Sequence, residues 1–179
     1  MDNTHFYILS QIIAFLGIVL SIVAFQQKKK TQILNFTIVS SLLYGIHYIF
    51  LNAWSGVANN MISVVRDCYV RRFGKKLHGI IPLLIFISAY VVLTIVTFDS
   101  WRSLLPLCAE IFYTIGVYYC NEQRLRIVKI VSCLLWLAFN SLVFSVIGIA
   151  SDLLVIAFTL FAYIRYEKKD HKKTSRRRD

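Results

Sequence analysis

Residues 79–98 read GIIPLLIFISAYVVLTIVTF and contain no charged side chain. A helix of about 20 apolar residues can cross the hydrocarbon core of a bilayer, so we expect this stretch to span a membrane. Its only proline, Pro82, falls within the expected first turn, where proline does not break a helix. The stretch lies near the middle of the chain, so whether it crosses decides how the two flanking parts are oriented relative to each other.

Six further apolar stretches flank this central one. The chain of 179 residues is 58% hydrophobic, against about 45 to 50% in soluble globular proteins. The apolar runs are continuous rather than alternating, which indicates membrane helices and not the strands of a barrel. The sequence therefore predicts an all-α membrane protein with seven transmembrane helices. Besides 79–98, the expected spans are about 6–25, 33–51, 56–73, 102–120, 126–143 and 147–165.

The basic residues predict the orientation of these spans. All lysines and arginines except Arg66 and Arg102 lie in four places: after the first span, after the third, at the start of the sixth, and beyond Ile164. Lysine and arginine in short loops stay in the cytoplasm, and seven crossings with the N-terminus outside place all four groups there. The first span follows no basic region and precedes no cleavage site, so we expect a retained helix rather than a signal peptide.

The net charge of +11 does not indicate a nucleic-acid binder, because the basic residues separate apolar stretches instead of lining one face. The segment 167–179 is expected to be a disordered, basic cytoplasmic tail attracted to anionic lipid. The cysteines form no CxxC motif and no cluster with histidine, so we expect buried free thiols and no metal site. They are Cys68, Cys108, Cys120 and Cys133.

An internal repeat relates the two flanking parts. A shift of 92 positions superposes the second and third expected spans on the sixth and seventh without a gap, matching Gly56 with Gly148 and the run 38–40 with 130–132. Both copies begin at a basic connection, so they run parallel, and 79–98 supplies the extra crossing that a parallel copy needs. We expect a 3+1+3 arrangement: first repeat 1–78, linker helix 79–98, second repeat 99–166.

The stretch from Asn35 to Arg66, with Tyr44, His47, Tyr48 and Gly56, resembles the bacterial inner-membrane proteins of the YgjV type. That type is similar in layout to the PQ-loop and SWEET-like superfamily, and the resemblance covers nearly the whole chain. It implies a multi-pass protein of the bacterial inner membrane. The chain departs from the superfamily at the end of the first span, where Phe25-Gln26-Gln27 replaces the Pro-Gln pair. SWEET-like gating at a proline hinge therefore does not carry over.

Polar residues inside the expected spans are the candidates for function, because such residues are costly in lipid. Asp152 matches Asn60 across the repeat, and Ser151 matches Asn59, so four polar side chains recur at one depth and could bind a small polar solute. The alternative is that they only join helices. The full candidate set is Asn59, Asn60, Ser151, Asp152, His47, Asn140 and Glu110.

Three members of this set have alternatives of their own. His47 and Asn140 lie near the level of the four and would extend the site, although a single histidine is more often a packing residue. Glu110 is expected to pair with Arg66, which could instead pair with Asp67 or extend to the inner headgroups. If Glu110 were unpaired, it could be protonated and support a proton-coupled step.

The function that fits these features best is a transporter or facilitator of a small polar solute, with its site between the two repeats. The alternative is a non-transporting membrane partner or assembly protein. The sequence contains no HExxH, G-x-S-x-G, CxxC or paired-carboxylate motif, so we do not expect an enzyme. No cofactor and no nucleic-acid partner are expected; the bilayer is the expected environment, and a homo-oligomer remains open.

Overall fold

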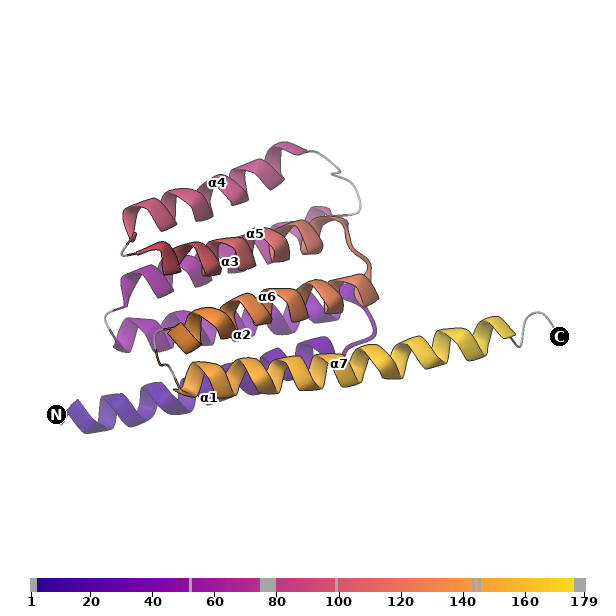
Figure 1. The fold of residues 1–179 in the computed structure, drawn as a ribbon, viewed down its shortest axis with the longest axis horizontal. Coiled ribbons are helices and arrows are strands. Elements are labelled where there is room, and N and C mark those ends of the chain that lie inside the picture. The colour runs from indigo at the N-terminus through magenta and orange to yellow at the C-terminus, as the bar shows by residue number, and fades with distance from the viewer. Residues whose placement is uncertain are drawn as a thin grey trace.

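The computed structural model describes residues 3–51, 53–74, 80–98, 100–142, 144 and 146–175. In this part of the chain it contains seven α helices and one short 3-10 helix (Figure 1). The helices are α1 (Asn3–Phe25), α2 (Lys30–Phe50), α3 (Trp54–Phe73), α4 (Ile80–Val96), α5 (Leu104–Tyr119), α6 (Glu122–Leu142) and α7 (Val146–Ser175), and the 3-10 helix η1 is Trp101–Ser103. The expectation of an all-helical chain is confirmed.

Each expected span corresponds to one helix, and the largest difference is at the C-terminal end. We expected disorder from residue 167 onward, but α7 continues to Ser175. That expectation was wrong because lysine, arginine and glutamate are good helix formers, and no glycine or proline follows Gly148 to end the helix. The last residues, 176–179, and the basic positions Lys75 and Lys76 lie outside the described residues.

Four helices within the described ranges are long and apolar enough to cross a membrane. They contain the stretches Ile8–Phe25, Lys30–Phe50, Glu122–Leu142 and Gly148–Tyr166. Helix α4 is apolar but shorter, α5 has 16 residues, and α3 contains several charged side chains, among them Arg66 and Asp67. Large apolar side chains on the outer faces are widely exposed, such as Val96 at 77% and Ile81 at 69%. Lipid is the medium that such faces require.

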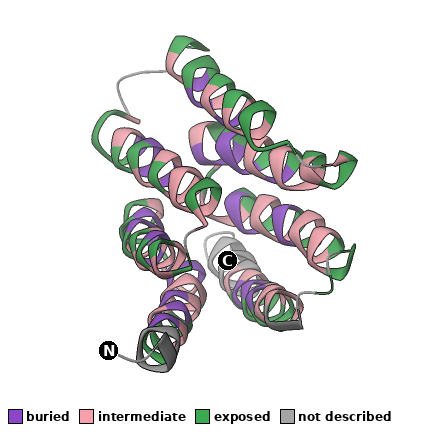
Figure 2. Cartoon of the chain, turned by 90° about the vertical axis from the view of Figure 1, so that its left-hand side faces the viewer, coloured by how far each residue is buried: buried purple, intermediate pink, exposed green. Residues whose placement is uncertain are grey.

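The helices form two facing layers (Figures 1 and 2). In one layer α2 packs between α1 and α3, and in the other α6 packs between α5 and α7. The layers meet where α1 contacts α7 and where α3 contacts α5. Helix α4 contacts α3 and α5 at one edge of the assembly. Helix α1 begins and helix α7 ends on opposite sides of the assembly, as Figure 1 shows.

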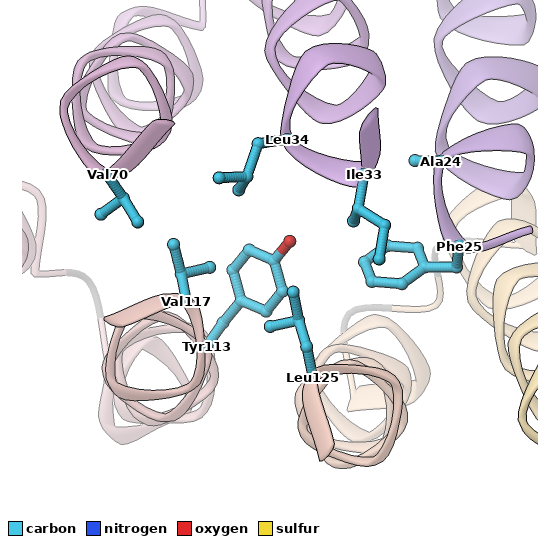
Figure 3. Close-up of a cluster of buried hydrophobic side chains, with 8 residues drawn as sticks. All are labelled: Ala24, Phe25, Ile33, Leu34, Val70, Tyr113, Val117 and Leu125. Carbon is cyan, nitrogen blue, oxygen red and sulfur yellow. The ribbon is translucent and has the colours of Figure 1, made fainter. Parts of the chain in front are cut away.

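An apolar cluster closes one end of the space between the layers (Figure 3). It is built from the last residues of α1 and α3, the first residues of α2 and α6, and the second half of α5. Its members are Ala24, Phe25, Ile33, Leu34, Val70, Tyr113, Val117 and Leu125, all at most 6% exposed. We call this the core end, and the opposite end, where α2 and α6 finish, the far end.

The cysteines are free thiols, but they do not share one environment. Cys133 is buried and Cys120 is half-buried, whereas Cys68 and Cys108 are exposed. The expectation that all four are buried was therefore wrong for the last two. Both lie on helix faces turned away from the interior, where a small apolar thiol can face lipid at little cost.

Candidate functional site

Asp152 is the centre of a polar cluster in the far-end half of the interior. The Asn140 amide donates a hydrogen bond to Asp152 Oδ2 at 2.8 Å, which joins α6 to α7. From the other layer, the Tyr44 hydroxyl of α2 is close enough to Ser151 for a hydrogen bond. Three candidates from the sequence, Asn140, Ser151 and Asp152, are thus brought together, and Tyr44 of the opposite layer joins them.

Asn59 and Asn60 of α3 are not part of this cluster. α3 and α7 lie at diagonally opposite corners of the two layers (Figure 2). The Asn60 amide donates to the Gly56 carbonyl of its own helix at 2.8 Å, and among the described contacts no hydrogen bond links either asparagine to α7. The contacts around the two repeat-related pairs therefore differ.

His47 turns toward α1. Its Nδ1 lies 3.1 Å from Ser10 Oγ and 2.9 Å from the Ser10 carbonyl oxygen, and its ring packs at a tilt against Tyr48 with centroids 5.2 Å apart. These contacts hold α2 against α1, which is the packing role weighed above. They also fix the position of Tyr48, whose ring lies against Gly56 of α3.

Arg66 is the most heavily bonded charge in the described interior. Its Nε donates to Asp67 at 2.8 Å, and its Nη1 lies 3.3 Å from Glu110 Oε2, so the expected pairing with Glu110 is present together with the pairing to Asp67. The arginine is 1% exposed and does not extend to the headgroups. Because Glu110 is paired, the condition under which we expected it to be protonated is not met.

Neutral side chains from three other places complete this ion cluster. Arg66 Nη1 also donates to the Tyr90 hydroxyl of α4 at 3.0 Å and to Thr114 of α5 at 3.1 Å. Thr37 of α2 donates to the second oxygen of Asp67 at 3.0 Å. Buried ionic groups are tolerated when their remaining donors and acceptors are satisfied, and here four helices supply the partners. The cluster fixes α4 against the two layers.

Lys129 is a basic residue whose role the sequence analysis missed. It was counted as a loop charge, but it lies on α6, partly buried, with its ammonium 5.8 Å from the Phe25 ring centroid and 5.2 Å from that of Tyr113. It also hydrogen bonds with Cys133 one turn further along the helix. The ammonium therefore lies beside the apolar cluster, over the rings of Phe25 and Tyr113.

Arg126 was also counted as a loop charge, yet it is 1% exposed and holds the core end together. Its guanidinium donates to the Phe25 carbonyl at 3.0 Å and to the Gln27 carbonyl, both at the end of α1. The Tyr166 hydroxyl of α7 donates to the carbonyl between them, that of Gln26, at 2.8 Å. Side chains of α6 and α7 thus donate to three successive backbone carbonyls at the α1–α2 connection. We call this set of bonds the latch.

The positions of Arg126 and Lys129 around the axis of α6 could have revealed that both point inward. Arg126 and Lys129 are three positions apart and share a helix face, whereas Arg124 is two positions from Arg126 and is exposed. Positive-inside counting treats all three alike because it ignores the face on which each residue lies.

Repeat-related glycines occupy related contacts. A Cβ atom at Gly56 would lie 2.7 Å from the Tyr48 ring, and one at Gly148 would lie 2.5 Å from the Asn140 side chain. Tyr48 and Asn140 are themselves 92 positions apart. Gly56 allows α2 and α3 to approach closely, and Gly148 allows α6 and α7 to approach closely beside Asn140 of the polar cluster. Within the described residues, no group of three or more histidine, cysteine, aspartate or glutamate side chains is placed to hold a metal ion.

Comparison with known proteins gives one match. The sequence profile of a family described as bacterial inner membrane protein, Imp-YgjV, matches residues 8–170. No curated protein and no solved structure matches the chain significantly. The family match spans nearly all of the helical assembly, including the latch, the ion cluster and the polar cluster. The chain therefore belongs to the YgjV-type family of bacterial inner membrane proteins.

Proposed function

We propose that all seven helices cross the inner membrane in a 3+1+3 arrangement, with α1–α3 and α5–α7 as parallel repeats and α4 between them in sequence. The contacts between layers support this reading, because a two-fold axis along the membrane normal would exchange the α1–α7 contact with the α5–α3 contact. The matched glycine contacts at Gly56 and Gly148 support it as well. The basic residues then orient the core end toward the cytoplasm and the N-terminus outward.

We further propose that the protein carries a small polar solute across the membrane through a site between the repeats. The observation that carries this proposal is the cluster around Asp152, in which side chains of α6 and α7 meet Tyr44 of the opposite layer. Polar and ionisable groups in the interior of a membrane bundle mark solute and ion pathways by default. Asn140, Ser151 and Asp152 would contact the solute directly.

The apolar cluster and the latch would form the cytoplasmic barrier of this transporter. Arg126 and Tyr166 belong to the second repeat, while the carbonyls that they bind belong to the end of α1. Separation of the two repeats at the core end would have to break these bonds together with the apolar contacts. Glu110, held by Arg66, would keep α3 and α5 together during that movement.

Solute flux into liposomes tests the proposal. The purified full chain is reconstituted into liposomes, and urea, glycerol, glucose or glycine is added outside at high concentration. The vesicles shrink at first and swell again as the solute enters, and light scattering follows their volume. At least one solute should enter faster than into empty liposomes. Asp152→Leu should abolish that flux, while Ser141→Leu, which changes an exposed polar residue beside Asn140, should leave it unchanged.

Circular dichroism and gel filtration verify that each variant is folded. Wild-type flux in Asp152→Leu would remove the site assignment. Flux equal to that of empty liposomes for every solute would contradict transport and favour the non-transporting alternative, for which the local contacts of His47 and Asn60 are sufficient explanation.

A further inference from the structure

Arg124 and Arg165 are exposed arginines at the core end of two neighbouring helices, α6 and α7. In the part of the chain that the structure describes, neither guanidinium belongs to an ion pair, since both ion pairs there are formed by Arg66. The nearby Arg126 and Lys30 differ, because their side chains donate to backbone carbonyls of the opposite layer. The two exposed arginines are therefore available to a partner outside the chain.

The latch places these two arginines at one level of the assembly. The guanidinium carbon of Arg126 lies 4.6 Å from the centroid of the Tyr166 ring, and the guanidinium carbon of Arg165 lies 6.0 Å from the same centroid. Arg124 is two positions before Arg126, which is about 3 Å along a helix axis. Both exposed arginines thus lie beside the latch, where α6 begins and α7 passes the end of α1.

On α7, Arg165 ends a stripe of exposed apolar side chains. Phe161, Phe158 and Leu154 lie 4, 7 and 11 positions before it and are all exposed, and this spacing puts the four residues on one helix face. At 1.5 Å per residue the stripe is about 16 Å long. Half of the hydrocarbon core of a bilayer measures about 15 Å. The stripe therefore matches the acyl region of one leaflet, with the arginine at the headgroup level.

On α6, Arg124 begins a stripe of the same kind. Ile127, Val131 and Leu134 follow it at 3, 7 and 10 positions and are exposed. Because α6 and α7 are antiparallel neighbours in one layer, both stripes run from the core end toward the middle of the bilayer (Figure 1). The first layer lacks this pair of arginines on neighbouring helices, since Gln32 of α2 stands 92 positions before Arg124.

We infer that this face of α6 and α7 binds an anionic phospholipid with two phosphates, of the cardiolipin class. One phosphate binds Arg124, the other binds Arg165, and the acyl chains lie along the two stripes. Arginine suits this role because its planar guanidinium donates to phosphate through two parallel hydrogen bonds. A soluble polyanion would use the arginines and leave the stripes uncovered, whereas a lipid uses both. The inference does not depend on transport.

Native mass spectrometry of the full chain in detergent tests this inference, with cardiolipin, phosphatidylglycerol and phosphatidylcholine as the titrated lipids. Cardiolipin should bind at least about tenfold more tightly than phosphatidylglycerol, which offers a single phosphate, because one charge-assisted hydrogen-bonded contact is lost. Phosphatidylcholine, which has no net charge, should bind more weakly than either. Equal affinity for cardiolipin and phosphatidylglycerol would overturn the two-phosphate proposal.

Variants locate the lipid on the protein. Arg124→Gln and Arg165→Gln should each weaken cardiolipin binding about tenfold, to the level of phosphatidylglycerol. The matched control is Arg72→Gln, which changes an exposed arginine at the core end of α3 and should leave the dissociation constant nearly unchanged. Circular dichroism verifies that each variant is folded. An equal loss in Arg72→Gln would indicate general surface charge, and unchanged binding in Arg124→Gln and Arg165→Gln would place the lipid elsewhere; either result overturns the proposal.

Discussion

Replacing Arg66 by methionine is expected to destabilise the fold more than any other single change to the ion cluster. Methionine keeps much of the apolar length of the side chain but removes the guanidinium that forms ion pairs with Asp67 and Glu110. Both carboxylates would then stay in the interior without a cation. Breaking a buried ion pair from one side costs about 3 to 5 kcal/mol, because the remaining charge is left unmatched.

The bond lengths rank the two carboxylates. Asp67 takes the Nε hydrogen at 2.8 Å and is also bonded by Thr37. Glu110 shares Nη1 with Tyr90 and Thr114, and its contact is the longest of the three at 3.3 Å. Nη1 has only two hydrogens for these three acceptors. We therefore expect Asp67→Asn to cost about 1.5 to 3 kcal/mol and Glu110→Gln about 1 kcal/mol.

Unfolding of the purified chain in mixed micelles with increasing dodecyl sulfate, followed by circular dichroism, measures these free energies. The matched control is Arg102→Met, the same chemical change at an exposed arginine, which should shift the free energy of unfolding by no more than about 0.5 kcal/mol. The double variant Arg66→Met/Asp67→Asn should be more stable than Arg66→Met alone, because one unmatched carboxylate is removed.

Two results would refute this reasoning. One is a cost for Arg66→Met no greater than for Arg102→Met, which would mean that the guanidinium is solvated or that the cluster contributes nothing. The other is a Glu110→Gln cost equal to that of Arg66→Met, which would make Glu110 rather than Asp67 the principal partner.

Three other predictions address the latch, the helix contact and the orientation. Arg126→Met should cost about 2 to 4 kcal/mol and speed protease cleavage of the α1–α2 connection, since two bonded carbonyls lose their donor; the exposed Arg124→Met should do neither, and equal cleavage in both would disprove the latch. Gly148→Ala should cost about 1 to 3 kcal/mol in the same unfolding assay by displacing Asn140, and wild-type stability would show that the helices are not tightly packed there. Lys28→Cys in an otherwise cysteine-free chain should react with an impermeant maleimide only after spheroplasts are opened; labelling of intact spheroplasts would reverse the proposed orientation.

Much of the fold could be predicted because it depends on patterns that lie within single segments. Apolar length and loop charge were sufficient to anticipate seven helices with short connections. The Arg66–Glu110 pair could be anticipated because a charge in lipid needs a partner and few were available. Even so, the sequence favoured no single choice among Glu110, Asp67 and the headgroups, and the structure uses both carboxylates.

The sequence by itself determined that this chain is helical and belongs in a membrane, because hydropathy is a property of the chain in one dimension. Only the tertiary structure decided which side chains meet. The rotation of α6 turns Arg126 and Lys129 inward while Arg124 faces out, and the facing of the two layers sets Tyr44 of α2 beside Ser151 of α7. Contacts of this kind depend on how helices rotate and pack against one another, and the order of residues along one helix does not contain that information.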